Sequence, residues 1–168
     1  MPVAAKPAPD GTMPVEIDIA DPRWREVSGM TACVERAASA ARDCLAASDV
    51  AGPVAIRLSN DGEVRELNRT FRGKDTPTNV LSFPAPADES SSHFADEPSM
   101  GDIILALETV QREAEIDGKK FESHVAHLVI HGVLHLAGFD HEEHEDAEEM
   151  ESLEIEVLQR LGIENPYT

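Results

Sequence analysis

The histidines between residues 131 and 141 are the side chains of this sequence best suited to chemistry. His131 and His135 stand four residues apart, so on a helix they project from the same face and can reach one ion. Gly138 can adopt the left-handed conformation that ends a helix, which lets the chain turn back and bring in His141. Three neutral imidazoles with an open fourth position are typical of a catalytic Zn²⁺ site, and Ni²⁺ would also suit. We therefore predict one divalent transition metal ion per chain, bound by His131, His135 and His141.

The spacing of this segment matches the zinc peptidase pattern His-Glu-x-x-His-x-x-Gly-x-x-His at every position but one. Gly132 stands where those peptidases carry the glutamate that takes a proton from the metal-bound water. The ligand pattern is therefore kept, whereas peptidase chemistry is not supported. We expect Gly132 to leave room beside the metal for a bulky substrate. We also expect Gly132→Glu to keep both the metal and the fold, since Glu is a better helix former than Gly.

Four further histidines need an interpretation. His124 and His127 lie within about 40° of the face that carries His131, at about 100° per residue. We interpret His127 as a structural residue or as one that supports a ligand. We expect His124, His144 and the loop residue His93 to be exposed to solvent.

The hydrophobic pattern predicts the elements that position these residues. Alternating apolar residues or short apolar runs predict strands at 14–20, 54–58, 79–83 and 101–107. Helical spacing predicts helices at 29–47, 61–71, 108–116, 120–137 and 145–161. Asn60 with Glu63 three residues later is typical of a capping box, which favours a helix start there. The fold class is α+β, a single domain with about four strands in a mixed sheet, about five helices and a metal cleft formed by the His-bearing helix.

Composition bounds the domain organisation and the environment. Residues 1–13 are expected to form a flexible tail and residues 14–168 one hydrolase domain, with a mobile Pro/Ser-rich loop at 85–100. No apolar run approaches the ~20 residues needed to span a bilayer, and residues 1–13 lack the apolar core of a secretory signal. Cys33 and Cys44 are separated by too much of one predicted helix to form a disulfide. Together these features favour the cytoplasm.

The charge distribution limits how this chain could bind nucleic acid. The formal net charge of -19 argues against broad, non-specific binding, which needs Lys and Arg to displace counterions. The charge is uneven, since residues 140–156 are rich in Asp and Glu and contain no Lys or Arg. A local basic edge is expected at Arg65, Arg69, Arg72 and Lys74.

Four blocks of the sequence resemble the bacterial YbeY family of metal-dependent endoribonucleases and ribosomal RNA maturation factors. The histidine string from His131 to His141 resembles the family signature, and the block from Leu67 to Pro84, with its Arg-Gly-Lys-Asp segment, agrees with it. Gly101-Asp-Ile and Glu148-Glu-Met-Glu-Ser-Leu-Glu follow in the expected order. The resemblance extends over residues from about 60 to 160.

This resemblance implies a substrate and roles for particular residues. The family's metal-binding histidines correspond to His131, His135 and His141, and its functionally important arginine corresponds to Arg72. The implied substrate is single-stranded RNA, especially the 3′ end of the small-subunit ribosomal RNA. The implied partner is the assembling small ribosomal subunit, with no DNA and no membrane involved. If the ribosome supplies the docking surface, this strongly acidic protein needs no strong RNA affinity of its own.

The expected chemistry is phosphodiester hydrolysis. The metal would lower the pKa of a bound water toward ~7 or stabilise a charged phosphorane, and Arg72 would neutralise the non-bridging oxygens. Asp140 is a candidate general base, although orienting a ligand imidazole is an equally good role for it. Two alternatives remain open: a non-catalytic ribosome-assembly factor with a structural metal, and a different zinc-dependent hydrolase. An open groove lined by Arg72 would favour the enzyme over the assembly factor.

Overall fold

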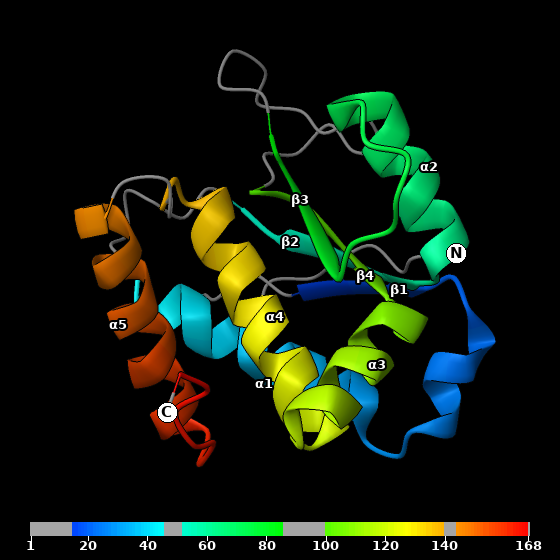
Figure 1. Cartoon of the computed structure of the whole chain (residues 1–168). Coiled ribbons are helices and arrows are strands. Elements are labelled where there is room, and N and C mark those ends of the chain that lie inside the picture. Colours follow the sequence, from blue (N-terminus) through cyan, green and yellow to red (C-terminus); the bar gives the residue numbers. More distant parts are fainter. Residues whose placement is uncertain (1–14, 46–51, 86–99, 140–143, 168) are drawn as a thin grey trace.

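A four-stranded mixed sheet forms the centre of the protein (Figure 1). The computed structural model describes residues 15–45, 52–85, 100–139 and 144–167. The strands, in the order in which they lie in the sheet, are β1 (Val15–Ile19), β2 (Val54–Ser59), β4 (Gly101–Ala106) and β3 (Val80–Pro84). The first three are parallel, and β3 pairs antiparallel with β4 at one edge. That edge position accommodates Pro84, which has no amide hydrogen to donate.

The helices surround this sheet. They are the 3₁₀ helix η1 (Pro22–Glu26) and the α-helices α1 (Met30–Asp43), α2 (Asp61–Arg72), α3 (Leu107–Asp117), α4 (Phe121–Leu136) and α5 (His144–Arg160). None of the described helices is long and apolar enough to span a membrane. The predicted α+β fold class, with its mixed four-stranded sheet and five α-helices, is confirmed. The predicted tail at 1–13 and most of the predicted loop at 85–100 lie outside the described residues.

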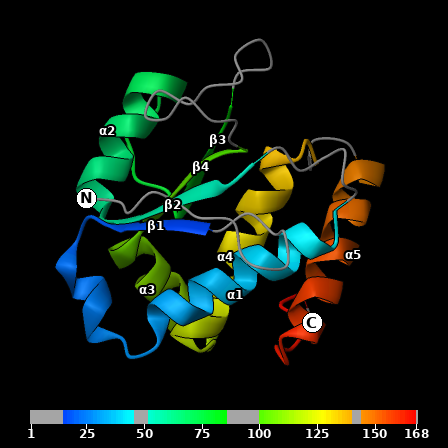
Figure 2. The ribbon, with the colours of Figure 1, turned by 180° about the vertical axis from the view of Figure 1, so that it is seen from behind.

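The alternation of side chains along the strands places helices on both faces of the sheet. On one face, Ile56, Ile103 and Leu105 pack in the main core with residues of α1 and α4. On the other face, Ile104 and Leu81 pack beneath Val64 of α2. Figures 1 and 2 show the sheet lying between α2 and the pair formed by α1 and α4. The His-bearing helix α4 therefore lies on the opposite face of β3 from α2.

The C-terminal end of α4 closes as its sequence predicts. Gly138 has a φ of 99°, a value that a residue with a side chain rarely adopts. Its amide donates to the carbonyl of His135 at 3.0 Å, and the amide of Phe139 donates to the carbonyl of Leu134 at 3.0 Å. These bonds satisfy carbonyls of the last helical turn, as in a glycine-terminated helix.

The two ends of α2 fix the place of Arg72. The side chain of Asn60 accepts a hydrogen bond from the amide of Glu63 at 3.0 Å, so the predicted N-cap is confirmed. The Glu63 carboxylate is bound by Arg57, with Nε and Oε1 2.6 Å apart. At the other end, Gly73 adopts a φ of 70° and stops the helix. Arg72 is therefore the last helical residue, one position beyond the predicted end.

Candidate metal centre

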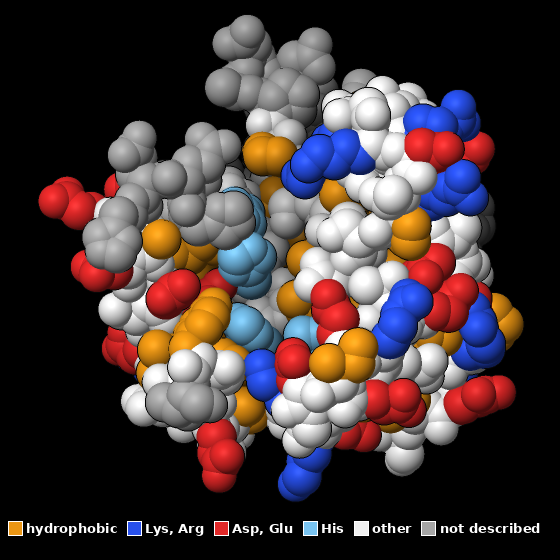
Figure 3. Space-filling view, in the orientation of Figure 1, with side chains coloured by type: hydrophobic (Ala, Val, Ile, Leu, Met, Phe, Trp, Pro, Cys, Tyr) orange, Lys and Arg blue, Asp and Glu red, His pale blue; other side chains and the backbone are white. Residues whose placement is uncertain are grey.

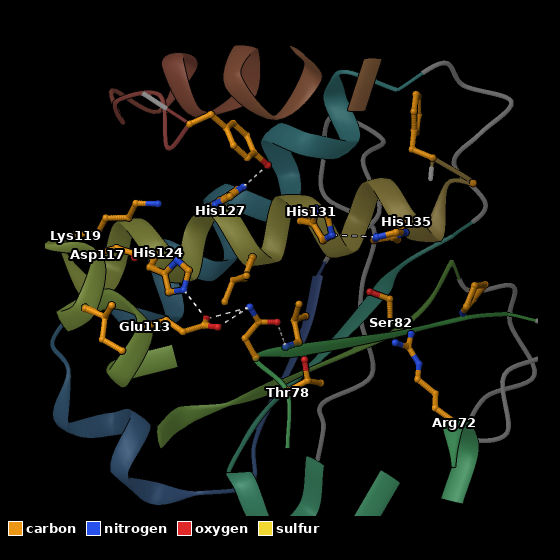
Figure 4. Close-up of a pocket in the computed structure, with 18 residues that line it drawn as sticks. Arg72, Thr78, Ser82, Glu113, Asp117, Lys119, His124, His127, His131 and His135 are labelled. Carbon is orange, nitrogen blue, oxygen red and sulfur yellow. Dashed lines mark hydrogen bonds and ion pairs between the residues drawn. The ribbon is translucent and has the colours of Figure 1, made fainter. Parts of the chain in front are cut away.

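A groove with a volume of about 1010 Å³ lies between α4 and β3. Four histidines that follow one another along α4 line one wall, and Figure 3 shows histidine side chains lining this hollow. They lie on one stripe of α4 because their spacing keeps them near one helix face. In chain order they are His124, His127, His131 and His135. Figure 4 shows Thr78, Ser82 and Arg72 across the groove from them, and Glu113 beside His124.

His131 and His135 point their ring nitrogens toward each other (Figure 4). Their two Nε2 atoms are 3.0 Å apart. Two nitrogens bound to one tetrahedral zinc ion with ordinary bond lengths are about 3.3 Å apart, so this pair needs little adjustment to share an ion. The imidazole nitrogens also suit borderline metals chemically. The donor set and its separation therefore fit the predicted metal.

A buried carboxylate lies behind His131. Glu154 of α5 is 0% exposed, and its two oxygens contact Nδ1 of His131, Nε2 of His127 at 3.2 Å, and the hydroxyl of Tyr167. Burial by itself raises the pKa of Glu154, but the hydrogen bonds from His127, His131 and Tyr167 outweigh it and lower the pKa to about 2. Burial, and then the hydrogen bond to Glu154, raise the pKa of Tyr167.

Glu154 and Tyr167 are not among the site residues that the sequence predicted. The sequence does carry a signal for Glu154, because it lies four residues from both Met150 and Leu158, which are buried. An acidic residue in the apolar stripe of a helix predicts a buried partner that donates hydrogen bonds. Tyr167 has no comparable signal, since it follows the last helix in an irregular segment.

His124 differs from its expectation. The prediction that it is exposed to solvent is wrong, because its side chain is buried, with only 6% of the residue exposed. Its Nε2 atom lies 2.9 Å from Oε1 of Glu113, which also accepts a hydrogen bond from Asn79 at 3.0 Å. Helix α3 packs beside α4 and carries Glu113, and it thereby covers His124.

His127 does not contact the predicted metal position directly. Its ring and that of the candidate ligand His131 both contact the carboxylate of Glu154.

Gly132 also differs from its expectation. Gly132 is buried against the sheet, and a Cβ atom there would lie 2.9 Å from Cδ1 of Ile103. The expectations that this glycine leaves room for substrate and that Gly132→Glu keeps the fold are therefore wrong. The absent side chain allows close approach between α4 and β4.

Arg72 lies across the groove from His135 (Figure 4). Its side chain is exposed, and it forms no ion pair with the residues that the structure describes. Its neighbours on α2 are paired: Arg65 with Asp75 at 2.9 Å, and Arg69 with Glu66 at 3.1 Å. The guanidinium of Arg72 is therefore available to an anion in the groove.

Two predicted site residues, His141 and Asp140, lie outside the described residues, as does His93. Phe139, two positions before His141 in the chain, lines the groove. Within the described part of the chain, no group of three or more His, Cys, Asp or Glu side chains is arranged to hold a metal ion. The structure therefore brings together two of the three predicted ligands.

Comparison with known proteins identifies relatives over most of the chain. The family model described as Endoribonuclease YbeY matches residues 19–162. Curated proteins of that name from Rhodopseudomonas palustris and a Chelativorans species are 47% and 48% identical to this chain. These alignments include 86% and 91% of this chain, and 75% and 92% of the relatives. A Thermotoga maritima protein solved in solution superposes with a TM-score of 0.50 at 29% identity, covering 87% of this chain and 91% of that one. The chain belongs to the YbeY endoribonuclease family.

Proposed function

We propose that this protein is a metal-dependent endoribonuclease that hydrolyses phosphodiester bonds of single-stranded RNA. We further propose that it acts in ribosomal RNA maturation at the 3′ end of the small-subunit RNA and in ribosome quality control. The relatives named as endoribonucleases support the reaction class. The observation that carries the proposal is the pair of Nε2 atoms of His131 and His135, 3.0 Å apart, in an open groove that Arg72 also lines.

His131, His135 and His141 would hold one Zn²⁺ ion, or Ni²⁺ in its place. The ion would act as a Lewis acid that activates water and stabilises negative charge on the phosphate. His131 and His135 lie in a groove that opens to solvent and not in a closed core. This arrangement favours a catalytic over a purely structural metal.

The opposite wall of the groove would bind the phosphodiester. The guanidinium of Arg72 can donate two parallel hydrogen bonds to non-bridging phosphate oxygens. Thr78 and Ser82 line the groove and carry hydroxyl groups that can donate to the same substrate. Asp140 remains a candidate for the general base or for the orientation of a ligand ring.

The charge of the protein bears on its partner. A net charge of -19 disfavours binding to RNA through the backbone alone. Of the residues predicted to form a basic edge, Arg72 lines the groove, whereas Arg69 is paired with Glu66. We therefore propose that the enzyme acts on the assembling small ribosomal subunit in the cytoplasm, where other components supply the docking surface.

Cleavage of a single-stranded RNA that carries the small-subunit 3′ end tests this function. We expect cleavage by the zinc-loaded protein, loss of cleavage after EDTA treatment and dialysis, and recovery on addition of Zn²⁺. His135→Ala should not be recovered by zinc at the same concentration. Undiminished cleavage by metal-free protein would contradict the proposal. So would a zinc-loaded protein that cleaves neither this RNA nor the same RNA in immature small subunits.

A further inference from the structure

The carboxylate of Glu154 has no role in the proposed reaction, yet among the described residues it is the most completely buried acidic group. Only 1% of its side chain is exposed. The carboxylate belongs to α5 and contacts both α4 and the segment that follows α5 (residues 161–167), here called the C-terminal segment. Burial of a carboxylate is costly unless several donors satisfy it. Here three donors meet it: two ring nitrogens of α4 and the hydroxyl of Tyr167.

The direction of hydrogen bonding at His131 follows from this arrangement. An ionised carboxylate can only accept, so Nδ1 of His131 must carry the hydrogen that is shared with Oε1 of Glu154. In a neutral imidazole the other nitrogen then holds the lone pair. That nitrogen is Nε2, which faces Nε2 of His135 at 3.0 Å. Glu154 thus favours the tautomer that a metal ion requires.

The C-terminal segment holds the other oxygen of this carboxylate. Tyr167 donates its hydroxyl to Oε2, which also contacts Nε2 of His127 at 3.2 Å. Two further hydrogen bonds hold the segment: the Lys119 ammonium donates to the carbonyl of Pro166 at 3.3 Å, and the Tyr167 amide donates to Asn165 at 2.8 Å. Tyr167 lines the groove, so this segment forms part of its wall.

We propose that Glu154 is a positioning residue of the metal centre: it holds His131 in the tautomer that presents Nε2 to the ion. The Tyr167 hydroxyl in turn fixes the carboxylate, so the last described residues of the chain belong to the site. This inference rests on the metal centre of the proposed function. It assigns a role to two residues that do not contact the ion or the RNA.

Zinc affinity of the full-length protein, measured against a competing chelator dye, is the first test. Glu154→Gln keeps the shape but turns one acceptor into a donor. Either His131, or His127 together with Tyr167, then loses its acceptor, because Oε2 receives two of the three hydrogen bonds. We expect its zinc affinity to fall by about 10–100-fold, a usual loss for a group that orients a ligand. Glu154→Asp should recover part of the affinity, and Tyr167→Phe should lose less than Glu154→Gln. Glu156→Gln, the same change on an exposed position of α5, is the matched control and should bind normally.

Nuclear magnetic resonance separates positioning from simple stability. The ¹⁵N shifts of the His131 ring in metal-free protein should report Nδ1–H in the wild type and a mixture of tautomers in Glu154→Gln. Tyr167 is the single tyrosine of the chain, so a ¹³C label on its ring gives one signal. That signal should shift when Zn²⁺ is added to the wild type and stay unchanged in His131→Ala.

Two outcomes would overturn the inference. One is a folded Glu154→Gln protein with wild-type zinc affinity and the wild-type tautomer. The other applies if Glu154→Gln does not fold. In that case the inference fails if zinc leaves the Tyr167 signal of the wild type unmoved and Tyr167→Phe binds zinc with wild-type affinity. Zinc binding that depends on Glu154 in a protein that cleaves no RNA would instead contradict the proposed function and leave this inference standing.

Discussion

Gly132 of α4 lies so close to Ile103 of β4 that a Cβ atom on Gly132 would be 2.9 Å from Cδ1 of Ile103. Ile103 is fully buried in the main core, so its side chain has little space into which it could move. The missing glutamate of the zinc peptidase pattern therefore has a structural reason. A side chain at this position would separate the His-bearing helix from the sheet.

Gly132→Ala should lower the free energy of unfolding by about 1 kcal/mol, because overpacking of about 1–3 kcal/mol exceeds a helix-propensity gain of about 1 kcal/mol. Gly132→Glu should prevent folding. Gly62→Ala is the control, since a Cβ there meets its nearest atom at 3.4 Å; that change should stabilise α2. Denaturant unfolding measures both. A Gly132→Ala protein more stable than the wild type would show that α4 can move away from the sheet. Adding Ile103→Val to Gly132→Ala should restore part of the lost stability, because it removes Cδ1.

Purified protein should contain about one equivalent of a divalent transition metal. His131→Ala, His135→Ala and His141→Ala should each reduce the content strongly, because three protein ligands are expected to hold the ion. His127→Ala should keep most of it, since His127 contacts Glu154 and not the expected position of the ion. Elemental mass spectrometry provides the measurement. Unchanged metal in the triple variant would refute the ligand assignment.

Arg72→Ala should lower RNA cleavage by about 100-fold, the loss typical for removal of a donor that stabilises transition-state charge. The melting temperature should change little, because Arg72 is exposed and pairs with no described acidic residue. Arg72→Lys should recover only part of the rate, since an ammonium cannot bind a phosphate bidentately. Arg65→Ala on the same helix is the control. If Arg72→Ala cleaved RNA at the wild-type rate per folded molecule, Arg72 would have no role in the reaction.

Glu113→Ala should destabilise the protein by about 1–3 kcal/mol, because it leaves the buried His124 ring and the Asn79 amide without their acceptor. Metal content should stay at the wild-type level, since Glu113 contacts neither His131 nor His135 in the described structure. Glu115→Ala, at an exposed position of α3, should be neutral. Thermal unfolding with elemental analysis distinguishes the two effects. Loss of metal in Glu113→Ala would extend the centre to this end of the groove.

The sequence by itself determined the features that depend on neighbouring residues. The four-residue spacing of His131 and His135 placed both rings on one helix face, and Gly138 marked the end of that helix. Asn60 marked the start of α2, and the alternating runs located the four strands. Such features are local, because helix and strand periods fix which side chains share a face. The histidine string, together with the three other sequence blocks, also indicated the family.

Only the tertiary structure decided what each face packs against. The same periodicity that aligns His124 with His131 cannot show that α3 covers His124 with Glu113. It places Glu154 in an apolar stripe, but only the packing of α5 on α4 makes its partner the ring of His131. It places Gly132 in the helix, but the contact with Ile103 depends on how closely that helix approaches the sheet. Burial and partner identity are properties of long-range packing, and no local pattern along the chain encodes the distance between two elements.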